Sequence, residues 1–314
     1  WLRPATFAAA AGVLGALADL PIEFVEGYAV ECRYGMTEQS VNSWLAERAK
    51  EIGIGTALTS VLAGAFSALL VKAPLRWPLI SSAGAFPLFV LANVIVPLYI
   101  MPLFNKFEPL TGPLENRLRT LAARYNVGDA QILRVDMSRQ TKKANAYVTG
   151  VFNTHRIVIG DTLLENFTES EVEFVVAHEL GHYVSKDSWR IIGVGEITTL
   201  LTFLASNAAI PGSQRSRFGE PGMLIRLYFW ITVFSQLLRP ALLAFMRSRE
   251  WAADEFAVTT TRKPAIGAVA FERLRDQNLA EDEQPAWYEF FFGSHPSLKA
   301  RIAALRSIQD DLGT

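Results

Sequence analysis

Several stretches of this chain are long, apolar and almost free of charge. The 18-residue run from Ile54 to Val71 contains no charged residue, and the run from Trp77 to Asn105 is uncharged throughout, although prolines interrupt it. Runs of this length match the hydrocarbon core of a bilayer, so both are predicted to span a membrane. Residues 191–214 and 227–246 carry one charge each, and residues 5–18 carry none. The sequence therefore predicts about five membrane spans.

The composition of the 314-residue chain agrees with a membrane protein. Half of the residues (50%) are hydrophobic and 19% are charged, and the mean hydropathy is +0.20. Soluble domains usually carry more charge than this. The net charge is −1, and the chain has no basic segment. A lipid bilayer is therefore expected as a partner, and nucleic acid is not.

Two stretches are polar enough to fold in water, one over residues 105–190 and one over residues 247–314. We expect membrane helices over residues 1–104, with about three spans, and two more spans over residues 191–246. The two polar stretches are then two parts of one domain. Because an even number of crossings separates them, both parts emerge on the same side of the membrane and can share one site.

A short motif in the first polar stretch has a defined metal chemistry. His178, Glu179 and His182 belong to the sequence His-Glu-Leu-Gly-His, and Thr168 with Glu171 forms a capping-box signature just before it. A helix is therefore predicted to begin directly after Thr168. On one face of that helix His178 and His182 can bind the same metal ion, while Glu179 points at the water that the metal holds. This pattern predicts a zinc protease site with Glu179 as its base.

A catalytic zinc site needs a third protein ligand and leaves its fourth position open. Glu250 and Asp254 are four residues apart, so Glu250 can bind the metal while Asp254 hydrogen-bonds the far nitrogen of a ligand histidine. An exposed acidic pair is the alternative. His295, at a turn into the last predicted helix, and Arg301 can direct donors at the oxyanion of the reaction; a surface histidine and arginine are the alternative there.

Between the membrane helices and the motif, the pattern predicts a small sheet. A helix is expected over Pro113 to Val127, followed by strands over Gln131 to Val135, Ala144 to Val148 and Arg156 to Ile159. An exposed edge strand can pair with an extended substrate and hold its scissile bond over the metal. We assign this role to the segment from Lys143 to Tyr147; a purely structural strand is the alternative.

Six segments together carry a family resemblance. In chain order they are Pro102 to Leu110, Asn145-Ala146-Tyr147, Arg156 to Leu164, His178 to His182, Glu250 to Asp254, and His295-Pro296. From about residue 17 to 305 the chain resembles the CAAX prenyl endopeptidases, which are polytopic zinc metallopeptidases of the Ste-twenty-four type within the gluzincins.

The resemblance implies roles for individual residues. One zinc ion per chain is bound by His178, His182 and Glu250, Glu179 is the base, and Asp254 supports a ligand histidine. The remaining implied site residues are Asn145, Ala146 and Tyr147 on the substrate-binding edge, and His295 and Arg301 near the substrate.

The resemblance also implies a fold class that is mainly α. The expected protein is a polytopic α-helical membrane protein that encloses a wet chamber, with an α+β zinc metalloprotease domain. Four charged residues in the spans are expected to face this chamber, because exposure to lipid is costly; they are Asp19, Glu23, Glu196 and Arg239. Family members have about seven spans, so two are expected before Trp1 and the chain is expected to be incomplete.

The predicted function is that of an integral membrane zinc metalloendopeptidase. It would use zinc-activated water to cleave peptide bonds of membrane-associated or lipid-modified (CAAX-like) polypeptides. A quality-control protease without prenyl specificity, and a non-enzymatic transporter or scaffold with structural zinc, are the alternatives. An intramembrane protease of the site-two type is excluded, because charges flank the motif. We expect a monomer whose protease domain faces the cytosol, in the inner membrane of a prokaryote or the endoplasmic reticulum of a eukaryote.

Overall fold

The computed structural model describes residues 2–150, 155–218 and 220–312. The chain divides into two units. The first comprises Trp1–Leu88 and Gly195–Leu238, and the second comprises Phe89–Val194 and Arg239–Thr314. The second unit contains both polar stretches in which the sequence places the metal site.

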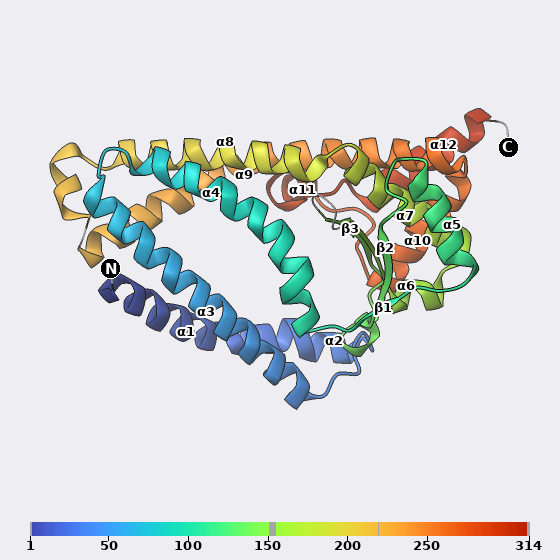
Figure 1. The fold of residues 1–314 in the computed structure, drawn as a ribbon, viewed down its shortest axis with the longest axis horizontal. Helices are drawn as coiled ribbons and strands as arrows, with labels where there is room; N and C mark the ends of the chain where they lie inside the picture. Colours follow the sequence, from blue (N-terminus) through green and yellow to red (C-terminus); the bar gives the residue numbers. More distant parts are fainter. Residues whose placement is uncertain (1, 151–154, 219, 313–314) are drawn as a thin grey trace. The chain divides into compact units, whose positions relative to one another are not determined.

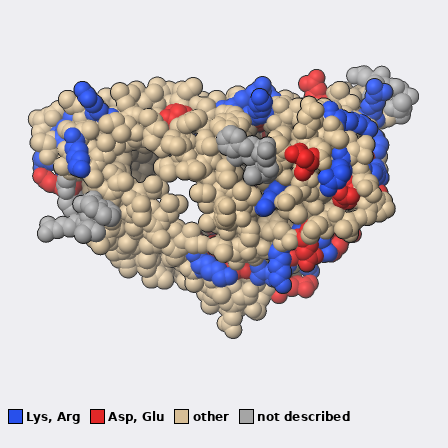
Figure 2. All heavy atoms as spheres, viewed as in Figure 1, with Lys and Arg blue, Asp and Glu red and all other residues tan. Residues whose placement is uncertain are grey.

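Among the described residues, five helices are long and apolar enough to cross a membrane. They are Ala5–Arg33, Val41–Lys72, Trp77–Leu103, Asp187–Ala209 and Gly222–Thr261. This confirms the predicted number of spans. Large apolar side chains such as Leu14, Val61 and Tyr228 are exposed on them, as a lipid-facing surface requires. Figure 2 shows the contrast: the long helices are largely tan, whereas charged side chains crowd the sheet and neighbouring helices of the second unit.

All the regular elements of the first unit among its described residues are helices. Its elements are α1 (Leu2–Phe24), η1 (Val25–Ala29), α2 (Val30–Arg33), α3 (Val41–Lys72), the first part of α4 (Trp77–Ile95), most of α8 (Asp187–Ala209), η5 (Gly212–Arg217) and the first part of α9 (Pro221–Thr261). Trp77 lies at the centre of a small apolar core with Leu70 and Leu227. Its indole N–H donates to Oδ1 of Asn207 at 3.1 Å, which satisfies the polar atom of this buried ring.

The third span ends in irregular helix. A π-helix, η2 (Val96–Ile100), and a 3₁₀-helix, η3 (Met101–Leu103), follow α4. Pro97 and Pro102 lie in these two segments. Because proline has no N–H and its ring clashes with the preceding turn, both residues favour a departure from regular α-helix at these positions.

A four-stranded sheet forms in the second unit. Its strands are β1 (Phe107–Pro109), β2 (Gln131–Val135), β3 (Ala146–Thr149) and β4 (Arg156–Gly160), in the order β1-β2-β4-β3. β2 and β4 are parallel, and the other two pairs are antiparallel. The three predicted strands are confirmed within two residues. β1 was not predicted, because it is short and ends in a proline. β3 lies at one edge of the sheet (Figure 1).

The second unit also contains helices, most of which share an apolar core with the sheet. Besides the short η4 (Met137–Arg139), these are α5 (Pro113–Ala123), α6 (Asp161–Asn166), α7 (Glu169–Val184), α10 (Pro264–Asn278), α11 (Ala286–Phe292) and α12 (Leu298–Leu312). Their shared apolar core includes Ile159, Phe174, Ala177 and Phe271. A Cβ atom at Gly267 would lie 2.2 Å from the ring of Phe174. Glycine at this position therefore allows α10 to approach α7 closely.

The helix α9 is 41 residues long and crosses from the first unit into the second. The sequence suggested a span that ends at residue 246, followed by a separate polar segment. Instead, one continuous helix carries the last candidate span and the acidic pair Glu250 and Asp254. At about 1.5 Å per residue it is roughly twice as long as the hydrocarbon core is thick.

Candidate metal centre

The helix that carries the histidine motif begins at a capping box. Oγ1 of Thr168 accepts a hydrogen bond from the backbone N–H of Glu171 at 3.4 Å, and Oε2 of Glu171 accepts one from the backbone N–H of Thr168 at 2.7 Å. The predicted start of α7 is therefore confirmed. Val172, Phe174 and Val176 are buried in the core. This fixes α7 in the apolar core of the second unit, where Phe174 packs against Phe271 of α10.

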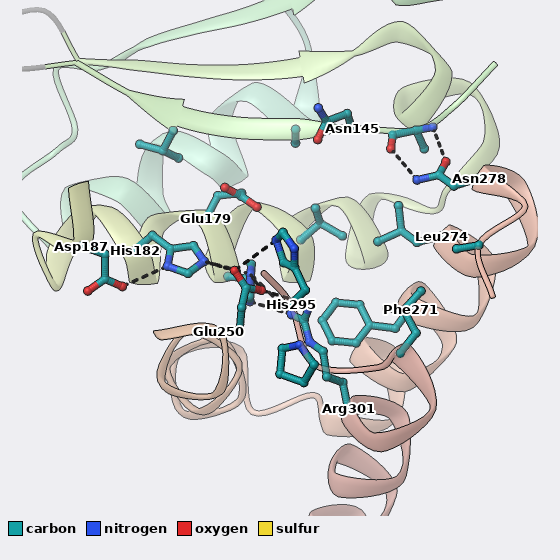
Figure 3. Close-up of a pocket in the computed structure, with 18 of the residues that line it drawn as sticks. Asn145, Glu179, His182, Asp187, Glu250, Phe271, Leu274, Asn278, His295 and Arg301 are labelled. Carbon is teal, nitrogen blue, oxygen red and sulfur yellow. Dashed lines mark hydrogen bonds and ion pairs between the residues drawn. The ribbon is translucent and has the colours of Figure 1, made fainter. Parts of the chain in front are cut away.

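Three side chains place possible ligand atoms within 4.8 Å of one another: His178 and His182 on α7, and Glu250 on α9. The Nε2 atoms of the two histidines are 3.2 Å apart. The Glu250 carboxylate lies 3.5 Å from Nε2 of His178 and 3.3 Å from that of His182. Figure 3 shows His182 and Glu250 directed toward each other. These are the ligand types of a catalytic zinc site.

One oxygen of Glu250 is buried and lacks a hydrogen bond. Within the described part of the chain, Oε2 has no hydrogen-bond partner. Nη1 of Arg301 lies 3.1 Å away as an ion pair, but without hydrogen-bond geometry. A buried carboxylate oxygen without a donor is costly unless something else binds it. The ligand atoms of His178, His182 and Glu250 fit a metal ion, and so does this oxygen without a hydrogen-bond donor.

A glycine in the motif allows the two ligand helices to meet. A Cβ atom on Gly181 would lie 3.2 Å from Cα of Ala253 and 3.1 Å from the ring of Phe256, both on α9. Any larger residue would push α9 away from α7. The small residue between the histidines therefore sets the distance at which Glu250 reaches them.

Each histidine has a carboxylate at its other nitrogen. Oδ1 of Asp254 lies 2.9 Å from Nδ1 of His178, and Oδ2 of Asp187 lies 3.0 Å from Nδ1 of His182. Both aspartates are buried. A carboxylate at Nδ1 holds the proton there and leaves Nε2 free to bind a metal.

Asp254 was assigned from the sequence, but Asp187 was missed. Asp187 follows His182 by five residues, a spacing that matches no face of a continuous helix. The chain turns between them, where Lys186 adopts a positive φ of 55°. This turn brings the first residue of α8 back to the histidine. An acidic residue just beyond the motif was the available signal.

Two arginines neutralise these buried carboxylates. Arg301 donates to Asp254 through Nε (2.8 Å) and Nη2 (2.6 Å), and its guanidinium lies over the ring of Phe271. Arg249 donates to Asp187 through Nε at 2.7 Å. Arg301 is only 5% exposed. Its contacts are those of a residue that holds the carboxylates in position.

The surroundings shift the pKa values of the α7 residues. Burial would lower the pKa of His178, but the neighbouring carboxylates of Asp254 and Glu250 raise it to about 9. Burial also works against the charged form of His182, and the Glu250 hydrogen bond raises its pKa. Burial raises the pKa of Glu179, which the charges of the two histidines offset only in part. A carboxylate with a raised pKa is a stronger general base.

His295 reaches the same centre from the turn before α12. Its Nε2 lies 3.3 Å from Oε1 of Glu250, and its Nδ1 lies 2.9 Å from Oγ of Ser294. Arg247 on α9 fixes the chain just upstream, because its Nη1 donates to the carbonyl oxygens of Glu289 and Gly293. The side chain of His295 remains 61% exposed, so it can meet a substrate.

A cavity of about 550 Å³ opens over these residues. Asn145 and Ala146 line it together with Glu179 and Arg301. Tyr147 does not: it borders a neighbouring cavity, and its hydroxyl donates to Sδ of Met101 at 3.4 Å. The structure thus brings together the predicted site residues, with Tyr147 directed elsewhere.

Comparison with known families covers nearly the whole chain. The model of peptidase family M48 matches residues 110–309, and the model described as the CAAX prenyl protease N-terminal region, with five membrane helices, matches residues 1–106. The chain belongs to peptidase family M48. It is an integral membrane metallopeptidase of the CAAX prenyl protease type, which confirms the predicted family and enzyme class.

Individual M48 relatives are similar over most of their length. The metalloprotease YhfN of Bacillus subtilis is 29% identical over 96% of this chain and 73% of its own. CAAX prenyl protease 1 of Saccharomyces cerevisiae is 27% identical, over 95% and 70%. The crystal structure of Ste24p from S. mikatae has a TM-score of 0.84 and 26% identity, and covers 96% of this chain and 75% of that one. These matches support the predicted fold class of a helical membrane protease of the chamber type.

Proposed function

We propose that this M48 protein is a zinc metalloendopeptidase in which His178, His182 and Glu250 hold one zinc ion. The convergence of these three side chains, with an oxygen of Glu250 left without a hydrogen bond, is the observation that carries the proposal. The nitrogen and oxygen ligands suit zinc. Asp254 and Asp187 hold the Nδ1 protons of the two histidines and orient their Nε2 atoms toward the metal position.

Each remaining residue has a place in peptide hydrolysis. Bound zinc would supply Lewis acidity and a water of lowered pKa. Glu179 takes the proton of the attacking water and later passes it to the leaving amine. His295, exposed at the cavity, donates to the developing oxyanion. Arg301 acts through Asp254 and His178 and holds them in place.

The substrate is held as an added strand. β3 is an edge strand, and Asn145 and Ala146 border the cavity beside Glu179. An extended peptide on this edge receives backbone hydrogen bonds that do not depend on its sequence. The exposed side chain of Asn145 can bind the peptide backbone next to the scissile bond.

The substrates we propose are membrane-associated polypeptides, among them lipid-modified CAAX-like ones. The relatives named CAAX prenyl protease support this class. The bacterial relative, named only as a metalloprotease, is equally similar and supports the alternative of a protease without prenyl specificity. We further propose that the protein acts as a monomer with its protease part in the cytosol, at the inner membrane or the endoplasmic reticulum.

The substrate class can be tested with one matched pair of peptides. Purified protein in proteoliposomes is given a CAAX peptide with a farnesylated cysteine and the same peptide with a free cysteine. We expect hydrolysis of both to stop when zinc is chelated and to return when zinc is added. Faster cleavage of the farnesylated peptide supports prenyl specificity, and equal rates support the broader protease. Hydrolysis that persists without metal rejects the proposed mechanism.

A further inference from the structure

A side chain of α10 covers the backbone of Ala144, two residues before β3, at one end of the edge that no other described strand pairs with. Oδ1 of Asn278 accepts a hydrogen bond from the backbone N–H of Ala144 at 2.8 Å, and its Nδ2 donates to the carbonyl oxygen of Ala144 at 3.2 Å. Figure 3 shows both bonds, at the end of the cavity where Leu274 lies. An amide side chain that makes this pair of bonds takes the place of one residue of a neighbouring strand.

The register of β3 shows which backbone groups face this free edge. The backbone N–H of Gly160 in β4 donates to the carbonyl oxygen of Asn145 at 2.9 Å, so Asn145 faces β4. Backbone groups of successive residues alternate between the two sides of a strand. The N–H and C=O groups of Ala144, Ala146 and Val148 therefore point away from β4, toward a possible substrate.

We propose that Asn278 is a specificity-determining residue that ends the substrate-pairing edge. An extended peptide can pair with Ala146 and Val148, but it meets Asn278 at Ala144 and must leave the edge there. Ala146 lines the cavity together with Glu179, so the bond that is cleaved lies near the closed end. The inference rests on the proposed peptidase function and adds a length limit on one side of that bond.

The orientation of the substrate decides which side is limited. Antiparallel pairing is the more stable arrangement per residue, and β3 itself pairs antiparallel with β4. A peptide antiparallel to β3 runs from Val148 toward Ala144. Its C-terminal part therefore reaches Asn278, whereas its N-terminal part continues along the open edge. The enzyme thus favours substrates in which few residues follow the scissile bond.

Asn278 is held firmly in this position. It is the last residue of α10, and the next residue, Leu279, caps the helix in a left-handed conformation with φ of 51°. Its neighbour Gln277 donates to the carbonyl oxygens of Lys142 (2.7 Å) and Thr162 (3.4 Å). A longer peptide would have to displace two hydrogen bonds from a fixed side chain, which corresponds to roughly a tenfold penalty in binding.

Two peptide series test the proposal. A peptide that the full-length protein in proteoliposomes cleaves at one bond, mapped by mass spectrometry, is extended one residue at a time at its C-terminus or at its N-terminus. For wild type we expect kcat/KM to fall about tenfold as the C-terminal side grows, and to change little with N-terminal extension. Asn278→Ala removes the side chain that covers Ala144, so its kcat/KM should change little as the peptide is extended at its C-terminus.

Two further variants distinguish a specific effect of Asn278 on the edge strand from a general loosening of the fold. Gln277→Ala removes bonds to Lys142 and Thr162 but leaves the outward groups of Ala144 covered, so it should keep the wild-type length dependence. Asn278→Asp keeps the size of the side chain but loses the donor, and should give an intermediate penalty.

Three results would overturn the length limit while leaving the peptidase function intact. The first is a wild-type kcat/KM that does not change with C-terminal extension, and the second is a kcat/KM that falls with N-terminal extension. The third is a loss of the C-terminal length dependence in Gln277→Ala as large as that in Asn278→Ala. If no starting peptide that wild type cleaves can be found, the proposed function itself fails.

Discussion

The carboxylate of Asp187 lies 3.0 Å from Nδ1 of His182 and also accepts a hydrogen bond from Arg249 at 2.7 Å. On the other histidine, Asp254 and Arg301 make the equivalent contacts. Both imidazoles are therefore held by a buried aspartate that is itself neutralised by an arginine. Supports of this kind fix the direction of the ligand lone pair and raise its basicity.

We expect Asp187→Ala to weaken zinc binding about tenfold or more, because His182 loses the group that fixes its tautomer. The affinity would be measured by competition with a chelator of known zinc affinity. Asp187→Asn keeps an acceptor at Nδ1 and should bind zinc more tightly than the alanine variant. Equal affinity of wild type and Asp187→Ala would show that the contact has no part in metal binding.

Wild-type protein should contain about one zinc ion per chain, since the ligand set provides for a single ion. The double variant His178→Ala, His182→Ala should contain none, as measured by elemental analysis of purified protein. His155→Ala is the matched control, because His155 contacts Asp129 away from the ligand cluster. Equal zinc content in the double variant and the control would contradict the assigned ligands.

Glu179→Gln should keep its zinc and its fold but lose peptide hydrolysis by about a hundredfold or more, because an amide cannot accept the proton of the attacking water. Zinc content, circular dichroism and the rate of cleavage of a generic peptide would be measured on one preparation. Glu281→Gln, an exposed glutamate, serves as the control. Retained cleavage in Glu179→Gln would remove Glu179 from the role of base.

Glu173 on α7 joins three helical segments of the second unit. It accepts hydrogen bonds from Arg117 at 2.6 Å and from Lys263 at 3.0 Å. Burial alone would raise the pKa of Glu173, but these two bonds hold it below its ordinary value of 4.5. A carboxylate whose pKa is lowered by folding stabilises the fold above its unfolded pKa, and this stability is lost as the pH falls through the folded pKa.

Glu173→Gln should therefore lower the melting temperature by a few degrees at neutral pH, which corresponds to about 1 kcal/mol for partly exposed partners. The difference from wild type should disappear as the pH falls through the lowered pKa of the wild-type carboxylate, where Glu173 becomes protonated. Glu165→Gln, at a more exposed ion pair with Arg134, should have a smaller effect. A difference that persists in acid would point to a cause other than charge.

The motif helix and much of the sheet could be predicted from local sequence. Thr168 with Glu171 marked the start of α7, and short runs rich in Val and Ile marked β2 and β4. These signals act between residues close in the chain, which is why they suffice. The membrane spans could be predicted equally well, because a helix that crosses the lipid requires a long uncharged run of residues.

Features that depend on tertiary contacts could not be predicted in this way. The role of Asp187 depends on the turn at Lys186, and that of Asn278 depends on α10 ending beside a strand 134 residues away in sequence. That α9 is one continuous helix could not be predicted for a different reason. Its charged residues from Arg247 to Glu250 end the apolar run, but helical structure does not require an apolar surface all round.

The continuity of α9 links catalysis to the physical state of the bilayer. Its hydrophobic part must match the local thickness of the lipid, and helices adapt to a mismatch by tilting. Glu250 and Asp254 belong to the same helix as the last candidate span, so we expect a change in the tilt of that span to affect the proposed metal ligand. We therefore expect metal affinity and turnover to depend on acyl-chain length and sterol content, an effect of membrane composition that needs no ligand bound to the enzyme.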